Sequence, residues 1–162
     1  MVKISFICPV YNKVKYLPSV LDSIKNQVGE FKKEFIFIND GSTDDSLSYL
    51  RSVTSKWKNT KIINQRNKGP SHATQVGIKN STGDFIKLVG GDDIMSPICT
   101  KILLNTIKKT NSVAVFSEYK LLNTYKKIKF KKQEEKIFLT INKPLKATIL
   151  SAFSGTTPNL YS

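Results

Sequence analysis

Acidic side chains gather in two short loops of a chain that is otherwise strongly basic. The 162 residues carry 12 acidic side chains, yet the formal net charge is +14. Residues 40–45 and 90–93 hold five of these acids, namely Asp40, Asp44, Asp45, Asp92 and Asp93. Clustered carboxylates can ligate a divalent cation or accept hydrogen bonds from a polar ligand. The two loops therefore predict a ligand site that includes a metal.

Each acidic loop follows a run of residues that is typical of a buried parallel strand. Strand and helix patterns alternate over the first two thirds of the sequence, which predicts an α/β fold with a mostly parallel sheet and helices on both faces. Loops at the carboxyl ends of such strands face the ligand crevice, so both acidic loops should meet there. The predicted strands are residues 3–8, 34–38, 61–64, 85–89 and 113–117.

The first acidic loop also carries the signals of a helix start. Ser42 and Asp45 are spaced as in a capping box, and negative charge is favourable in the first turn of a helix. We therefore interpret Asp44 and Asp45 as groups that serve the helix. Asp40 precedes the cap and is not explained by it.

The second acidic loop is followed by its own helix start. Ser96 is a capping residue, and Pro97 suits the first helical position. Because Ser96 already supplies the cap, Asp92 and Asp93 are left without a structural role, and both become candidate metal ligands.

Composition excludes several classes of protein. No stretch approaches the roughly 18 apolar residues of a membrane helix, and the first strand is too short and mixed for a signal peptide. We expect a cytoplasmic protein with one domain over residues 1–162. Cys8 and Cys99 are expected to be buried free thiols, and a single histidine, His72, leaves too few ligands for a zinc site.

The basic excess is almost entirely lysine. Residues 120–146 hold nine lysines against Glu134 and Glu135, a local balance of 9 − 2 = +7. Nucleic-acid surfaces favour arginine, so nucleic acid is not the expected partner, and a peripheral contact with the anionic inner face of a membrane fits better. A lysine-rich polyanion-binding module and a lysine bias of the genome are the alternatives.

The end of the first strand has no glycine-rich phosphate loop, so another device must hold phosphates. A Mn²⁺ or Mg²⁺ ion on Asp92 could do so, since these ions take one or two carboxylates together with phosphate oxygens. Tyr11 could stack on a base, and Asp40 could accept a hydrogen bond from a ring N–H. These parts would make a site for a nucleoside diphosphate.

Three ordered stretches resemble glycosyltransferase family 2. They are residues 4–17 with Pro-Val-Tyr-Asn at 9–12, residues 37–44, and residues 67–97 with Gly91, Asp92 and Asp93. The resemblance implies the GT-A fold, a nucleotide-sugar donor, most simply a uridine diphosphate sugar, and a divalent metal. It also implies inverting transfer to an acceptor hydroxyl, as in the synthesis of cell-surface polysaccharide or glycolipid.

The resemblance carries roles to particular residues. By matching positions, the nucleotide-binding residues are Pro9, Val10, Tyr11, Asp40, Gly69 and Gly91, and the metal ligands are Asp92 and Asp93. Two positions depart from the family pattern. Gly90 stands where an aspartate that contacts the ribose is usual, and Thr74 stands where an arginine is usual.

Family members generally continue into an acceptor region that carries an Asp or Glu as general base. On this comparison residues 1–117 are the nucleotide-sugar-binding core, and residues 118–162 are an incomplete start of the acceptor side. Glu118 is the only carboxylate between Asp93 and Glu134 and is a weak candidate for the base, because its position does not match that of the family's base. We therefore expect a truncated donor part or a donor-binding domain completed by another chain, with a non-catalytic nucleotide-sugar-binding domain as the alternative.

Overall fold

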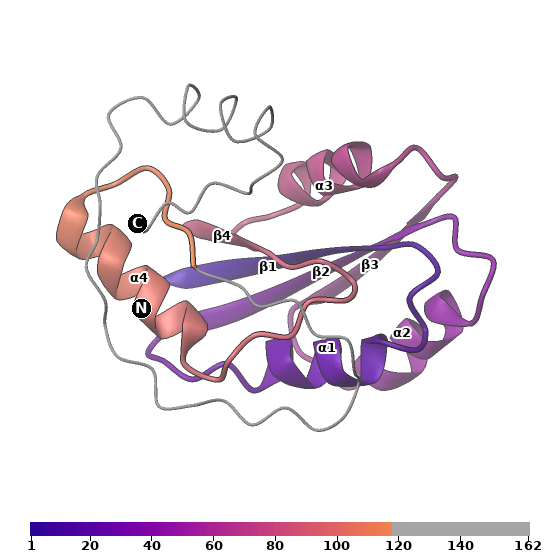
Figure 1. Ribbon diagram of the computed structural model, residues 1–162, viewed down its shortest axis with the longest axis horizontal. Coiled ribbons are helices and arrows are strands. Elements are labelled where there is room, and N and C mark those ends of the chain that lie inside the picture. The colour runs from indigo at the N-terminus through magenta and orange to yellow at the C-terminus, as the bar shows by residue number, and fades with distance from the viewer. Residues whose placement is uncertain (118–162) are drawn as a thin grey trace, which may run out of the picture. The chain divides into compact units, whose positions relative to one another are not determined.

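The structure is a computed structural model that describes residues 1–117, an α/β arrangement of four strands and four helices (Figure 1). The strands are β1 (Lys3–Val10), β2 (Lys32–Asp40), β3 (Thr60–Gln65) and β4 (Phe85–Leu88). The helices are α1 (Leu17–Lys25), α2 (Ser46–Thr54), α3 (Pro70–Lys79) and α4 (Cys99–Thr110). The chain divides into two compact units, Met1–Lys101 and Ile102–Ser162, and the sheet belongs to the first.

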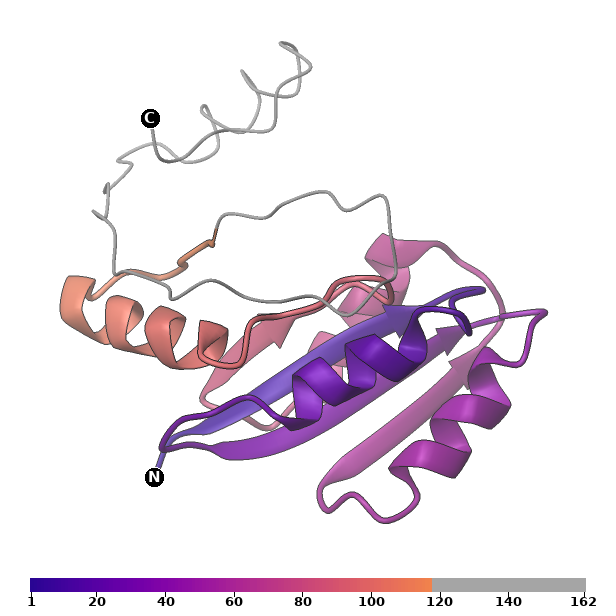
Figure 2. The same ribbon diagram turned by 60° about the horizontal axis from the view of Figure 1, so that its bottom comes forward.

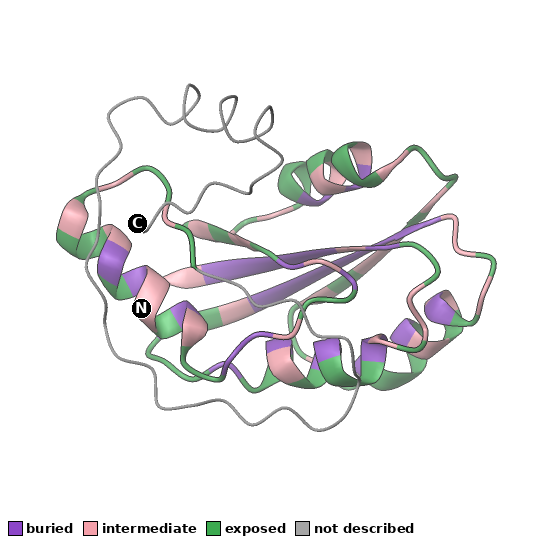
Figure 3. Cartoon of the chain, in the orientation of Figure 1, coloured by how far each residue is buried: buried purple, intermediate pink, exposed green. Residues whose placement is uncertain are grey.

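The four strands form one parallel sheet in the order β3-β2-β1-β4, which confirms the predicted fold class. α1 and α2 cover one face and α3 covers the other (Figures 1 and 2). The central strands β1 and β2 are buried along most of their length because both of their faces are covered (Figure 3). None of the helices within residues 1–117 is long and apolar enough to cross a membrane.

Beneath α3 the sheet presents a branched aliphatic surface. Ile7, Ile36 and Ile38 pack with Ala73 of this helix and are fully buried. Gly77 lets the helix approach the sheet closely, because a Cβ built there would lie 2.3 Å from the Ile7 side chain. The close packing of α3 sets the position of its amino end, where the candidate site lies.

The opposite face of the sheet is aromatic. Phe6 stacks on Phe35 with 5.9 Å between ring centroids, and Trp57 meets Phe35 edge-on at 5.0 Å. α1 packs on this side with Leu17 and Leu21 buried. The alternation of Ile and Phe along β2 thus separates an aliphatic layer from an aromatic one.

A buried carboxylate ties the amino ends of β1 and β2 to the loop that precedes β4. Glu34 accepts hydrogen bonds from Ser5 Oγ at 2.6 Å and from the Thr82 backbone N–H at 2.8 Å, and it pairs with Lys3 at 3.4 Å. Burial by itself raises the pKa of Glu34, but these hydrogen bonds and the nearby Lys3 charge outweigh it and lower the pKa to about 2.

The structure corrects four local predictions. The expected strand at 113–117 is absent from the described sheet, and Val113 is 101% exposed, because no described strand pairs with it. Ser42 does not cap α2, which begins at Ser46 with Asp45 at the N-cap. A turn at residues 97–98 precedes α4, so Pro97 is not its first residue. Cys8 is buried as expected, but Cys99 is only partly buried.

Candidate functional site

A cavity of about 710 Å³ lies at the carboxyl ends of β1, β2 and β4. The structure brings all eight predicted site residues to its wall: Pro9, Val10, Tyr11, Asp40, Gly69, Gly91, Asp92 and Asp93. The wall also includes residues to which we assigned no role, chiefly Lys13, Asn67, Pro70 and Leu88. The volume is within the usual range of small-molecule sites, about 300–1,000 Å³.

Asp40 ends β2 at the cavity wall and is only 3% exposed. Its Oδ1 accepts hydrogen bonds from Gln65 Nε2 at 2.7 Å and from the Lys68 backbone N–H at 3.0 Å. Gln65 is itself 3.2 Å from His72 Nδ1. No described residue donates to Oδ2. The carboxylate is therefore held in place by one oxygen and keeps the other for a ligand.

The loop after β1 is fastened to the first acidic loop by Asn12. This residue adopts a left-handed backbone (φ 52°), and its Oδ1 accepts hydrogen bonds from the backbone N–H groups of Thr43 at 2.8 Å and Asp44 at 3.3 Å. The Ser42 hydroxyl accepts from the Asn12 N–H instead of capping α2. The asparagine of the Pro-Val-Tyr-Asn stretch is thus a structural residue that orders the site.

Asp44 does serve the helix, as predicted. Its Oδ1 accepts a hydrogen bond from the Ser46 N–H at 3.0 Å, and its Oδ2 accepts one from the Val14 N–H at 3.1 Å. Burial raises the pKa of Asp44, and these hydrogen bonds outweigh it, so the pKa is lowered overall. Asp45 occupies the N-cap position without a side-chain hydrogen bond to the helix.

Tyr11 follows β1 directly and is 46% exposed at the cavity rim, where its ring is free to stack on a planar ligand. Pro9 lies within β1, one residue before its end, and pairs in register with Ile38 of β2. Its lack of an N–H is tolerated because β4 pairs with β1 only as far as Ile7. Gly91 packs over this point, since a Cβ there would lie 3.1 Å from the Pro9 carbonyl oxygen.

An ion pair links the two sides of the cavity mouth. Lys13 Nζ lies 2.5 Å from Asp92 Oδ2, with the two side chains 32% and 44% exposed. The hydrogen bond to Asp92 raises the pKa of Lys13, against the opposing effect of burial. A cation and an anion that remain accessible in one cavity can each exchange their partner for a charged ligand.

Asp93 has a structural role, contrary to the prediction from sequence. Its Oδ2 accepts a hydrogen bond from the Gly90 N–H at 3.0 Å, and its own N–H donates to the Gly90 carbonyl at 3.1 Å. These bonds close the turn that presents Asp92. Of the two candidate metal ligands, Asp92 is therefore the one whose position is not set by the turn.

The amino end of α3 completes the wall. Gly69 precedes the helix with φ 86°, a conformation that favours glycine, and a Cβ there would meet no atom within 4 Å. Its backbone therefore borders open space. The free N–H groups and the partial positive charge of a helix start favour anions such as phosphate.

The family model of glycosyl transferase family 2 matches residues 5–157. The chain belongs to glycosyl transferase family 2. An uncharacterized glycosyltransferase of Rickettsia felis is 32% identical over 121 residues, which are 75% of this chain and 20% of that protein. The cholesterol galactosyltransferase of Borreliella burgdorferi is 31% identical over 117 residues, 72% of this chain and 32% of that protein. The chain thus spans less than a third of these two relatives.

Solved glycosyltransferases share the fold of this family 2 chain. S. aureus TarS 1-349 in complex with UDP superimposes with a TM-score of 0.59 at 28% identity, over 67% of this chain and 33% of that one. A mannosyltransferase of Pyrobaculum calidifontis, solved with GDP-Man and Mn²⁺, has a TM-score of 0.59 at 21% identity, over 68% of this chain and 32% of that one. These neighbours confirm the GT-A fold.

Both departures from the family pattern lie at this cavity. Thr74 lines it where the family resemblance leads one to expect an arginine. A Cβ at Gly90 would lie 2.6 Å from Asp93 Oδ2, so the Asp93 carboxylate occupies the space that a side chain at position 90 would need. The cation at the mouth comes instead from Lys13, on the loop after β1. The sequence analysis did not single out Lys13, because nothing in its sequence context distinguishes it from the many other lysines of the chain.

The donor set fits a divalent metal only in combination with a ligand. Within residues 1–117 no group of three or more His, Cys, Asp or Glu side chains is arranged to hold an ion. Mg²⁺ and Mn²⁺, however, typically use one or two carboxylates and take the other oxygens from phosphates and water. Asp92 satisfies this requirement if Lys13 moves aside. Glu118, the weak candidate for a catalytic base, lies outside the described residues.

Proposed function

We propose that this chain is the donor-binding part of an inverting glycosyltransferase that moves a sugar from a uridine diphosphate sugar to an acceptor hydroxyl in cell-surface polysaccharide or glycolipid synthesis. The observation that carries the proposal is the convergence of three kinds of group on one cavity: an exposed ring at Tyr11, a fixed carboxylate at Asp40, and the Lys13–Asp92 pair. Family membership and the UDP complex of TarS support it.

The base would lie between Tyr11 and Asp40. Uracil presents one ring N–H, and the free Oδ2 of Asp40 accepts from it while the Tyr11 ring stacks on its face. A hydrogen bond to a charged acceptor contributes about 1.5–3 kcal/mol. Because Gln65 and Lys68 hold the other oxygen, the carboxylate needs no reorganisation when the nucleotide enters.

The diphosphate would lie between the start of α3 and the Lys13–Asp92 pair. Lys13 gives up Asp92 and donates to a phosphate oxygen, and the released carboxylate becomes available for Mn²⁺ or Mg²⁺. A bound cation would supply charge stabilisation for the departing diphosphate. The residues of the chain orient the donor and place positive charge beside its phosphates.

A non-catalytic nucleotide-sugar-binding domain is the second candidate. It is favoured by the fact that each of the three carboxylates at the described cavity is already engaged: Asp40 with Gln65, Asp92 with Lys13, and Asp93 with the Gly90 N–H. With Asp40 and Asp92 assigned to the nucleotide and the metal, and Asp93 closing the turn at Gly90, none of the three remains to deprotonate an acceptor hydroxyl. Binding of the donor without turnover would identify this alternative.

The test is a calorimetric titration of a uridine diphosphate sugar with and without Mn²⁺. We expect tighter binding with the metal, and we expect Asp92→Asn to abolish the difference while leaving metal-free binding largely intact. Asp45→Asn is the matched control, since Asp45 is an exposed acid that does not line the cavity. If Mn²⁺ leaves wild-type affinity unchanged, the assignment of Asp92 is wrong.

A further inference from the structure

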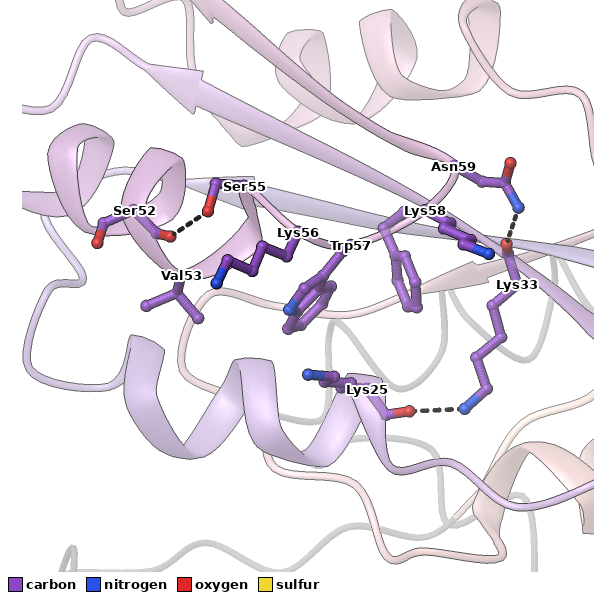
Figure 4. A pocket seen from close by; sticks show the side chains of 10 residues that line it. Lys25, Lys33, Ser52, Val53, Ser55, Lys56, Trp57, Lys58 and Asn59 are labelled. Atoms are coloured by element: carbon purple, nitrogen blue, oxygen red, sulfur yellow. Dashed lines mark hydrogen bonds between the residues drawn. The ribbon is translucent and has the colours of Figure 1, made fainter.

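A second cavity, of about 490 Å³, lies at the other end of the sheet, among the carboxyl ends of α1 and α2 and the amino ends of β2 and β3 (Figure 4). Its lining residues are Lys25, Lys33, Phe35, Ser52, Val53, Ser55, Lys56, Trp57, Lys58 and Asn59. We call it the lysine pocket. Four of the ten lining residues are lysines, and no lining residue is acidic.

The floor of the lysine pocket is apolar and firmly packed. Trp57 meets Phe35 edge-on at 5.0 Å and Phe37 at 6.1 Å between ring centroids. Val53 stands at the rim with 36% of its surface exposed. An aromatic floor under a rim of lysines and Val53 matches a ligand with both an anionic group and apolar carbon.

Two of the lysines are ordered within the pocket. Lys33 Nζ donates to the Lys25 carbonyl at 2.6 Å, and Lys25 Nζ lies 5.2 Å from the centroid of the Trp57 ring (Figure 4). Burial lowers the pKa of Lys33. Neither lysine pairs with a carboxylate in the described part of the chain.

The other two lysines, Lys56 and Lys58, are exposed on either side of Trp57. Neither makes a hydrogen bond or ion pair with another described residue. The described ion pairs use lysines elsewhere, at Lys3, Lys13 and Lys61. Four like charges gathered in one hollow repel each other, and an external anion would relieve that repulsion.

We propose that the lysine pocket binds the phosphate group of an anionic phospholipid, so that this end of the sheet rests on a membrane surface. Lysine is a compact point charge that suits phosphate without the bidentate geometry of arginine, and each lysine near an anionic surface contributes about 1 kcal/mol. Trp57 and Val53 provide the apolar floor and rim, and tryptophan is favoured at the level of the headgroups. The proposal is independent of the donor site.

Trp57 offers a local reporter, because it is the only tryptophan in the chain. The full chain is titrated with vesicles of phosphatidylglycerol mixed with phosphatidylcholine, and with vesicles of phosphatidylcholine alone, in about 0.05 M and about 0.3 M salt. We expect a shift of the Trp57 emission with the anionic vesicles only, weaker at the higher salt because the Debye length shortens. No shift with anionic vesicles would overturn the proposal.

Paired variants distinguish the pocket from general basic charge. Lys56→Gln with Lys58→Gln should weaken vesicle binding about tenfold or more, given the contribution of each lysine. The control, Lys15→Gln with Lys79→Gln, removes the same charge at two exposed positions that do not line the pocket. Equal losses in both pairs would show that net charge, not the pocket, governs binding.

Two soluble probes test the kind of ligand. Glycerol phosphate and a single-stranded oligonucleotide are titrated at the same phosphate concentration as the vesicles. If either probe shifts the Trp57 emission as strongly as the vesicles do, the pocket recognises a soluble phosphate or a nucleic acid and the membrane assignment is wrong. Asp92→Asn should bind vesicles like the wild type, so failure of the donor site leaves this test intact.

Discussion

The two ends of the sheet carry charge in opposite ways. At the carboxyl end, Asp40 and Asp93 are each held by hydrogen bonds from the protein, and Asp92 is paired with Lys13. At the lysine pocket, Lys56 and Lys58 have no partner among the described residues. The first arrangement suits a small ligand that must be placed accurately, whereas the second suits attraction to a surface.

The difference follows from where backbone donors are available. Loops after parallel strands, together with the starts of α2 and α3, supply N–H groups to the carboxylates, as at Lys68 and Ser46. Near the lysine pocket α1 and α2 end, and the partial negative charge of a helix end favours cations such as Lys25 in the last turn of α1. The backbone thus favours anions where α2 and α3 begin and cations where α1 and α2 end.

The largest effect concerns transfer itself. We expect the 162-residue chain, assayed alone with Mn²⁺ and a uridine diphosphate sugar, to transfer sugar to an acceptor no faster than it hydrolyses the donor. The described carboxylates at the cavity are engaged, and general-base catalysis typically contributes 10²–10⁴-fold. The measurement is product formation with lipid-linked and free sugar acceptors. Robust transfer would mean that Glu118, Glu134 or Glu135 supplies the base.

The next effect concerns Glu34, a hydrogen-bonded carboxylate at the same end of the sheet as Lys56 and Lys58, which are unpaired among the described residues. Glu34 has a folded pKa of about 2 against an ordinary value of 4.5, so its stabilisation is complete above about pH 4.5 and is lost as the pH falls toward 2. Glu34→Gln should lower the free energy of unfolding at pH 7 by on the order of 3 kcal/mol at most. Urea unfolding at pH 7 and pH 3 measures this, and the deficit should shrink at pH 3.

The exposed Glu30 supplies the control for that experiment. Glu30→Gln should leave the unfolding free energy within about 0.5 kcal/mol of the wild type at either pH. If Glu34→Gln changes the free energy of unfolding no more than Glu30→Gln does, the hydrogen bonds from Ser5 and Thr82 contribute no net stability. The hydrogen-bonded carboxylate would then be no more stabilising than an exposed one.

Asp40 tests the fixed carboxylate at the carboxyl end. Asp40→Asn keeps an oxygen for Gln65 and Lys68 but places an N–H₂ group where Oδ2 met the uracil N–H. We expect uridine diphosphate to bind about 10- to 100-fold more weakly, the equivalent of about 1.5–3 kcal/mol. Thermal unfolding of the variant checks that the fold is intact. Unchanged affinity with an intact fold would remove Asp40 from the base pocket.

The parallel sheet and the position of the candidate site could both be predicted from the sequence. The strand β2 has a continuous apolar run between polar ends, which is typical of a strand buried in a parallel sheet. Asp40 stands at its carboxyl end, which indicates where the site lies. All eight predicted residues line one cavity, because the carboxyl ends of parallel strands share one edge of the sheet.

The errors arose where a contact joins residues distant in sequence. Ser42 has the spacing of a helix cap, but its hydroxyl accepts a hydrogen bond from the backbone N–H of Asn12, which is about 30 positions away in the sequence. The turn role of Asp93 depends on backbone geometry at Gly90 that spacing does not reveal. The run at 113–117 is apolar enough for a strand, yet a strand also requires a hydrogen-bonded partner, and none of the described strands pairs with it.

The smallest effect concerns Lys13, the residue that the sequence did not single out. Because Lys13 neutralises Asp92 before any ligand arrives, it competes with a metal for that carboxylate. Lys13→Gln should therefore strengthen Mn²⁺ binding in the absence of nucleotide by only a few-fold, since a pair this exposed is worth about 1 kcal/mol or less. The same change should weaken metal-free binding of uridine diphosphate, because a cation beside the phosphates is lost. Lys15→Gln, two residues along and outside the cavity wall, should alter neither quantity. Calorimetry with Mn²⁺ alone and with uridine diphosphate alone separates the two effects, and a loss of Mn²⁺ affinity in Lys13→Gln would show that Lys13 does not compete with the metal for Asp92.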